Sequence, residues 1–217
     1  MSSKTTNDTK RRQEFTDRCR YLGLKHLAEE YQQIVNKATE RDVGYYDFIS
    51  DVVQAEAAAK RQRRIEYLIN TSRLPQPLKI LADFDFDFQP KLSRKLIMDL
   101  ASLSFIERKE SILFLGSNGV GKSHIARSLA LMACQSGYKT YYTTCSEMIN
   151  DLNAGVYEKT LDKRMRKYTG PQLLLIDEMG HDRLELQVVK EAHLLFKVID
   201  HRDKDNKPLI FTTNIDE

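Results

Sequence analysis

Long uncharged apolar runs are missing from this 217-residue sequence. The longest ones, at residues 111–115 and 173–176, fall far short of the roughly 20 residues that a membrane-spanning helix needs. The first twelve residues, MSSKTTNDTKRR, have no apolar stretch after their charges, so no secretory signal is visible. These absences exclude a membrane-spanning protein and predict a cytoplasmic one.

Cysteine is also scarce. Cys19, Cys134 and Cys145 are far apart, odd in number, and form no C-x-x-C pair with histidines nearby. The sequence therefore indicates reduced thiols instead of a disulfide framework or a structural zinc site.

An excess of charge of one sign is small overall, at a formal net charge of +3. Its distribution is uneven, because residues 1–73 carry 14 Lys+Arg against 11 Asp+Glu, whereas residues 74–217 carry 20 of each. A contact with a polyanion is therefore easier to place in the first third of the chain. The alternative interpretation of these charges is a solvated helical surface.

The first third of the chain shows helical periodicity. Residues 1–12 are polar and aperiodic, which predicts a flexible tail. Apolar residues then recur every three or four positions over 14–36, interrupted at Gly23, and again over 45–69. We expect a small all-helical domain at 13–73 that binds DNA or a partner.

A junction is expected at residues 74–90, where three prolines accompany an alternating DFDFDF run. In extended chain the three phenylalanines of this run face one way, which favours packing on the next domain. Stacking on nucleic acid is the alternative, although the interleaved aspartates repel phosphate. These phenylalanines are Phe84, Phe86 and Phe88.

Short apolar runs alternate with helical patterns over residues 91–217. We expect helices from Leu92 to Leu103 and then at 121–136, 146–168 and 185–203, and strands at 111–115, 140–144, 173–176 and 209–212. This alternation predicts an α/β fold in which helices sandwich a parallel sheet.

Residues 116–123, GSNGVGKS, match the phosphate-binding pattern G-x-x-x-x-G-K-[ST] at every fixed position. Its backbone N–H groups and the start of the following helix attract phosphate. Lys122 is expected to contact the β- and γ-phosphates of ATP, and the Ser123 hydroxyl to bind Mg²⁺. The expected nucleotide contacts are Gly116, Ser117, Asn118, Gly119, Val120, Gly121, Lys122, Ser123 and His124. For His124 we expect packing or backbone bonding instead of catalysis.

Two acids follow the apolar run 173–176. Ligands of an open α/β sheet bind at the carboxyl ends of its strands, so Asp177 is expected on the Mg²⁺ side, acting through water. Glu178 is then the residue that polarises the water attacking the γ-phosphate. Without the phosphate loop, both acids could equally be turn or helix-capping residues.

One expected strand, at 140–144, lies between the loop strand and the acid strand, and a second acid directly follows Asp177. Both features resemble the additional-strand, catalytic-glutamate branch of the P-loop ATPases. The last strand, PLIFTTN, ends where sensor 1 of that branch lies. By this resemblance Asn214 contacts the γ-phosphate and the attacking water. Thr213 is the second candidate for this role. The alternative is that the position is a simple turn residue without a role in the site.

Three stretches together resemble the IstB family of insertion-sequence transposition helper ATPases, relatives of the DnaC-type helicase loaders in the AAA+ class. They are residues 84–130, the LLLIDEMG strand and the FTTN ending. The resemblance implies a helical N-terminal domain, an AAA+ core, and ATP-dependent self-assembly along duplex DNA that guides a transposase.

One departure concerns the carboxyl end, because members of this family continue beyond the position of Glu217. An AAA+ sheet of order 5-1-4-3-2 would then lack its fifth strand, leaving the first strand at an edge. We expect a truncated product that binds nucleotide but hydrolyses it weakly, since an arginine finger contributes about 10³ to 10⁵ in rate.

Two basic runs are the candidates for DNA contact, and no motif suggests that they read bases. Their alternative interpretation is an exposed helix face. The runs are Lys60, Arg61, Arg63 and Arg64, and Lys163, Arg164, Arg166 and Lys167.

Three other functions compete with the transposition helper. A replicative helicase loader would share the chemistry but act on a helicase and single-stranded DNA. A nucleotide-binding interaction module would bind ATP without turnover. A small-molecule kinase is disfavoured, because no lid-type arginine cluster follows the loop.

Overall fold

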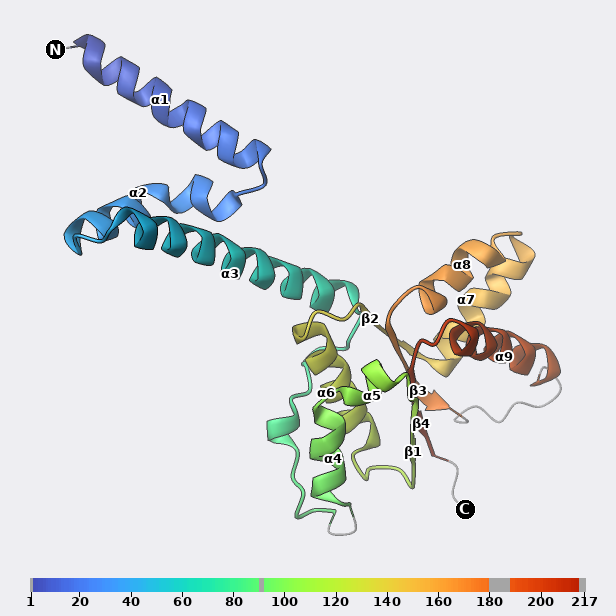
Figure 1. Cartoon of the computed structure of the whole chain (residues 1–217). Coiled ribbons are helices and arrows are strands. Elements are labelled where there is room, and N and C mark those ends of the chain that lie inside the picture. Colours follow the sequence, from blue (N-terminus) through green and yellow to red (C-terminus); the bar gives the residue numbers. More distant parts are fainter. Residues whose placement is uncertain (1, 90–91, 180–187, 215–217) are drawn as a thin grey trace. The chain divides into compact units, whose positions relative to one another are not determined.

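A computed structural model describes residues 2–89, 92–179 and 188–214 (Figure 1). The chain divides into two compact units, Met1–Arg64 and Ile65–Glu217. Within the described residues, none of the helices has both the length and the apolarity to cross a membrane.

The first unit contains α1 (Ser2–Tyr21), α2 (Lys25–Glu40) and most of α3 (Tyr45–Thr71). Its helical character agrees with the periodicity of the sequence, and the break between α1 and α2 includes Gly23 at φ +75°. The structure has a helix from Ser2, where the sequence predicts a flexible tail. Neither proline nor glycine interrupts this segment, and Arg12 and Asp8 form an ion pair of 2.9 Å one turn apart.

A buried carboxylate connects α3 with the start of α2. Glu56 accepts a hydrogen bond of 2.8 Å from the backbone N–H of Leu27, which is one of the donors that a helix start leaves without an intrahelical partner. Arg63 binds the other oxygen of Glu56 at 2.9 Å. Glu56 therefore acts as an N-cap supplied by another helix.

The second unit is built on a parallel sheet. Its described strands are β1 (Ile112–Leu115), β2 (Thr140–Thr144), β3 (Leu173–Met179) and β4 (Leu209–Thr213). They lie in the order β1-β4-β3-β2, which is the predicted order for four of the five expected strands. β1 is at one edge of this described sheet, and two of its side chains, Leu113 and Leu115, are 54% and 58% exposed.

Helices cover both faces of the sheet, as predicted (Figure 1). Leu173 and Leu175 belong to one apolar core, whereas Leu174 and Ile176 belong to the other, because successive side chains of a strand point to opposite faces. The first core contains α4 (Arg94–Ala101), α5 (Ser104–Arg108) and α6 (Lys122–Gln135). The second contains α7 (Cys145–Tyr157), α8 (Leu161–Thr169) and α9 (Val188–Lys204). Residues 185–187 of the expected last helix lie outside the described residues.

The expected linker at 74–90 is part of the second unit over its described residues. A short 3₁₀ helix (Leu81–Asp83) packs on α6, and Phe84 and Phe86 contact the first core. Phe88 is 68% exposed instead, because Asp85 accepts hydrogen bonds from the N–H groups of residues 87 and 88 and turns the chain. The boundary between units lies at residues 64 and 65, inside α3, and not at the prolines.

Candidate nucleotide-binding site

The carboxyl ends of β1, β3 and β4 meet at a cavity of about 310 Å³. The cavity is lined by residues of the phosphate loop and the start of α6, together with residues at the carboxyl ends of β3 and β4. They are Asn118, Gly119, Gly121, Lys122, Ser123, His124, Glu178, Thr212 and Asn214.

The phosphate loop joins β1 to α6, and its last glycine is the N-cap of that helix. Gly121 has φ +93°, a backbone conformation that is easy only for glycine. A Cβ atom at Gly121 would also lie 2.4 Å from the ring of Phe84. The Lys122 ammonium donates to the carbonyl oxygens of Gly116 and Ser117 at 2.6 and 2.7 Å, so the lysine folds over its own loop.

Asp177 on β3 is completely buried and lies next to the loop. Its Oδ1 accepts a hydrogen bond of 2.7 Å from Ser123, 54 residues earlier in the chain, and another from Thr212 on β4. Its Oδ2 accepts from Arg127 of α6 at 2.7 and 3.0 Å and from Tyr142 of β2 at 3.2 Å. Donors from α6, β2 and β4 therefore converge on this carboxylate.

The ionisation of Asp177 follows from these contacts. Burial acts to raise the pKa of Asp177, but hydrogen bonds from Thr212, Ser123 and Arg127 outweigh burial and hold the pKa below its usual range. Burial and the charge of Asp177 raise the pKa of Tyr142 to about 12. At neutral pH the site therefore holds an ionised carboxylate, a cationic Arg127 and a neutral tyrosine.

Glu178 follows Asp177 in an unusual backbone conformation, with φ +60°. The pairing of β3 with β4 shifts register between Ile176 and Met179, and the N–H of Glu178 donates to Thr212 Oγ1 at 3.0 Å. This irregularity places the exposed Glu178 in the lining of the cavity, separate from the buried Asp177.

The other predicted residues of the site differ in position. Asn214 lies in the cavity lining, whereas Thr213 is 2% exposed on β4. His124 Nε2 lies 3.0 Å from the carbonyl oxygen of Ile80, and its ring packs against Phe84 at 5.4 Å. The histidine thus connects the start of α6 with the chain before it.

Sequence reasoning missed Arg127, Tyr142 and the contact of Thr212 with Asp177. Arg127 had one available signal, since it lies four residues after Ser123 and therefore on the same face of a helix. Tyr142 stands in the middle of a strand and had none.

An oxygen-only pair, Ser123 Oγ and Asp177 Oδ1, fits a magnesium ion that also binds nucleotide phosphates. The carboxylate is ionised and the hydroxyl lies beside it, as such a site requires. Among the described residues, no group of three or more His, Cys, Asp or Glu side chains gathers into an all-protein metal cage.

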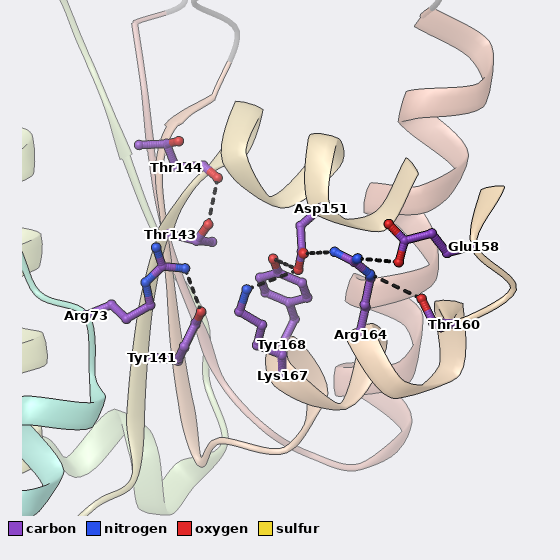
Figure 2. Close-up of polar contacts among 10 residues, drawn as sticks. All are labelled: Arg73, Tyr141, Thr143, Thr144, Asp151, Glu158, Thr160, Arg164, Lys167 and Tyr168. Carbon is purple, nitrogen blue, oxygen red and sulfur yellow. Dashed lines mark hydrogen bonds and ion pairs between the residues drawn. The ribbon is translucent and has the colours of Figure 1, made fainter. Parts of the chain in front are cut away.

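Two residues of the second basic run, Arg164 and Lys167, form ion pairs on α8, as Figure 2 shows. Arg164 binds Asp151 of α7 and, at 2.7 Å, Glu158; Lys167 binds Asp151 at 3.1 Å. Two of the four predicted DNA contacts therefore also take part in ion pairs between α7 and α8. Lys163 and Arg166 of the same run are exposed.

The first basic run lies on α3. Arg63 pairs with Glu56 at 2.9 Å and therefore contributes to helix packing. The other three side chains are exposed. They are Lys60, Arg61 and Arg64.

Strand order, phosphate loop and buried acid together define a P-loop fold of the AAA+ type. A model of the IstB-like ATP binding protein family matches residues 18–216. The chain belongs to this family, which confirms the resemblance found in the sequence.

Similar proteins come from insertion sequences. An insertion sequence IS5376 protein of Geobacillus stearothermophilus, described as ATP-binding, is 39% identical over 90% of this chain and 76% of its own length. The corresponding IS232 protein of Bacillus thuringiensis subsp. berliner is 32% identical over 94% of this chain and 79% of its own. An IS21 protein of Pseudomonas aeruginosa is 30% identical, over 89% and 71%.

Solved structures support the fold. AMPPCP-bound DnaA from Aquifex aeolicus superposes with a TM-score of 0.54 at 18% identity, over 66% of this chain and 43% of the DnaA chain. A crystal structure of DnaI gives a TM-score of 0.53 at 19% identity, over 66% and 77%.

Proposed function

We propose that this protein binds ATP with Mg²⁺ in the cavity at the carboxyl ends of β1, β3 and β4, and hydrolyses it. The observation that carries the proposal is the hydrogen bond of 2.7 Å between Ser123 and the buried Asp177. It joins the phosphate loop to the acid strand, and the relatives from insertion sequences are described as ATP-binding.

The residues divide the chemistry. Backbone N–H groups of 116–123 and the start of α6 bind the phosphates, and Lys122 exchanges its loop carbonyls for β- and γ-phosphate oxygens. Ser123 and Asp177 hold Mg²⁺, which when bound neutralises charge on the phosphates. Glu178 accepts a proton from the attacking water, and Asn214 orients that water.

Two substitutions separate binding from turnover. Lys122→Ala removes the cation of the loop, so ATP binding should weaken by at least tenfold. Glu178→Gln should leave the affinity for ATP nearly unchanged and lower the rate of phosphate release by about 10² or more, because the amide cannot accept the proton. Fluorescent-nucleotide titration and a phosphate-release assay measure the two quantities. Normal turnover by Glu178→Gln would refute the role of Glu178.

We further propose that ATP drives self-assembly of this protein on duplex DNA, and that this assembly assists a transposase. The family and the insertion-sequence origin of its relatives support this role. Exposed Lys60, Arg61 and Arg64 on α3 supply cationic charge for phosphates of the DNA backbone without reading bases. Lys163 and Arg166 supply further charge on α8.

A DNA-binding experiment tests this role. Binding to random-sequence duplex and to single strands is measured with ATP, with ADP and without nucleotide, at two salt concentrations. We expect ATP-dependent preference for duplex, and a salt slope lowered by about 1 per lost contact in Lys60→Ala/Arg61→Ala. Lys10→Ala/Lys25→Ala, which removes two exposed charges from the same unit, is the matched control. Preference for single strands would favour a helicase loader, and absence of DNA binding would leave a nucleotide-dependent interaction module.

A further inference from the structure

The two oxygens of Asp177 are held by different donors. Oδ1 faces the hydroxyls of Ser123 and Thr212. Oδ2 accepts hydrogen bonds from two N–H groups of Arg127 and from the hydroxyl of Tyr142. Tyr142 also accepts from Arg127 at 3.0 Å, so the three side chains form a closed triangle.

We propose that Arg127, supported by Tyr142, is a positioning residue that fixes the orientation of the Asp177 carboxylate, so that one of its oxygens faces the metal. This inference rests on the proposed binding of ATP with Mg²⁺. Arg127 does not touch the nucleotide in this role. It acts through the carboxylate, whose Oδ1 it leaves directed toward Ser123.

Rotation of the carboxylate is the motion that Arg127 prevents. A carboxyl group turns easily about its last bond, because that torsion is broad. In Asp177 a rotation would break three hydrogen bonds to Oδ2, two from N–H groups of Arg127 and one from the hydroxyl of Tyr142. The carboxylate is buried, so water could not replace them. Charge-assisted hydrogen bonds of this kind are the strong ones, so the observed orientation is favoured.

The placement of Arg127 couples it to the phosphate loop. Ser123 and Arg127 are four residues apart on α6 and share a face of the helix, so one rigid element contacts both oxygens. Tyr142 approaches from β2, beside β3 in the sheet. A shift of α6 against β3 would therefore disturb both halves of the carboxylate together.

The positive charge of Arg127 also offsets the cost of burying the carboxylate. The guanidinium is only partly exposed, at 23% of its side chain, and pairs with a fully buried acid. Removal of Arg127 alone would leave the carboxylate buried without its cationic partner.

Titration of Mg²⁺ tests the role. Binding of a fluorescent ATP analogue is measured in EDTA and over a range of Mg²⁺ concentrations, for the wild type and for Arg127→Met. We expect the half-saturating Mg²⁺ concentration to rise about 10- to 100-fold in Arg127→Met, as is usual when a partner of a metal-binding carboxylate is lost. Affinity in EDTA should change by less than about threefold, because the phosphate loop is intact.

Three further variants complete the design. Arg127→Lys restores the charge but offers fewer fixed donors, so it should recover part of the Mg²⁺ affinity. Tyr142→Phe removes one donor and should produce a smaller shift than Arg127→Met. Arg73→Met is the matched control, because it deletes an arginine–tyrosine hydrogen bond of 3.1 Å to Tyr141, the adjacent residue of β2.

The outcomes are distinct. A Mg²⁺ dependence that Arg127→Met leaves unchanged, or makes tighter, overturns the positioning role while the proposed ATP site stands. The same binding of the wild type in Mg²⁺ and EDTA would overturn the metal role of Asp177 and the positioning role with it. If Arg127→Met does not fold, Arg127→Lys and Tyr142→Phe decide, and unshifted Mg²⁺ titrations in both would refute the inference.

Discussion

Gly121 and Phe84 occupy adjoining space at the end of the phosphate loop. The ring of Phe84 lies where a Cβ atom on residue 121 would have to be, and the backbone at Gly121 is left-handed. Two independent requirements therefore coincide at one residue: the loop conformation and the approach of residues before β1.

Gly121→Ala should destabilise the second unit by about 2 kcal/mol or more, since a left-handed alanine costs about 1 to 2 kcal/mol and crowding adds to it. Urea unfolding measures the change. In a Phe84→Ala background the same substitution should cost less, because only the backbone part remains. An equal cost in both backgrounds would show that Phe84 does not set the requirement.

At this scale the sequence predicted the residues whose spacing along the chain is fixed by the chemistry. Lys122, Ser123 and Asp177 belong to this class, because a phosphate loop and an acid at a strand end have recognisable patterns. Arg127 and Tyr142 do not belong to it. Spacing places Arg127 on the same helix face as Ser123, but the contact of both residues with Asp177 depends on how α6 and β2 pack against β3, which no local pattern encodes.

At the scale of elements, α7 and α8 are joined through Asp151 (Figure 2). This carboxylate accepts hydrogen bonds from Arg164, from Lys167 at 3.1 Å, and from Tyr168 at 2.6 Å. Burial opposes ionisation of Asp151, but these donors outweigh it and hold the pKa of Asp151 below its ordinary value. Some of the basic side chains of α8 thus serve to pack this helix against α7.

The stabilisation from Asp151 should depend on pH. A carboxyl whose pKa is lowered by folding stabilises the fold above its unfolded pKa and loses this effect as the pH falls through its folded pKa. Asp151→Asn should therefore be less stable than the wild type at pH 7, by about 1 to 3 kcal/mol, and the difference should shrink at pH 3. Urea unfolding at both pH values measures it, with the exposed Asp162→Asn as control. A difference that is unchanged at pH 3 would contradict the prediction.

Element boundaries show why periodicity alone was insufficient. The sequence predicted one helix at 146–168, whereas α7 ends at Tyr157 and α8 begins at Leu161. Lys159 adopts φ +58° between them, and a Cβ atom on Gly155 would lie 2.7 Å from Arg164. The chain reverses here so that α8 can pack on α7, a tertiary requirement that leaves the apolar spacing nearly continuous.

For the whole molecule, the division into units predicts what can be separated. The second unit begins at Ile65 and retains the last turns of α3. Leu68 is buried there, its carbonyl oxygen faces the thiol of Cys134, and the carbonyl oxygen of Ser72 accepts from Tyr142 N at 2.7 Å. The end of α3 is therefore part of the nucleotide-binding unit.

A fragment of residues 65–217 should fold and bind ATP with an affinity within about threefold of the full chain, because the loop and its supports are all retained. Circular dichroism and fluorescent-nucleotide titration measure this, with Lys122→Ala in the same fragment as the control. DNA binding should fall in the fragment, since Lys60, Arg61 and Arg64 are gone. A fragment that fails to fold or to bind ATP would refute the independence of the unit.

The sequence located this division imperfectly for a physical reason. Prolines and alternating acids at 74–90 predict a segment without regular secondary structure. Such a segment can be either a linker between domains or a part of one domain that packs on its core. Leu74 and Leu81 are buried in the first core, so this segment packs on the core of the second unit. The parallel sheet was predictable, because alternating strands and helices allow few topologies, whereas its strand order was predicted from the family resemblance.

The contact between Phe84 and Gly121 has a practical consequence for spectroscopy. The chain contains no tryptophan, so Phe84→Trp would place a single indole fluorophore against the phosphate loop. Its emission would report the shape of the loop directly, without a label on the nucleotide. One fluorescence measurement would then detect changes in the loop, in its ligand and in the segment between α3 and the loop.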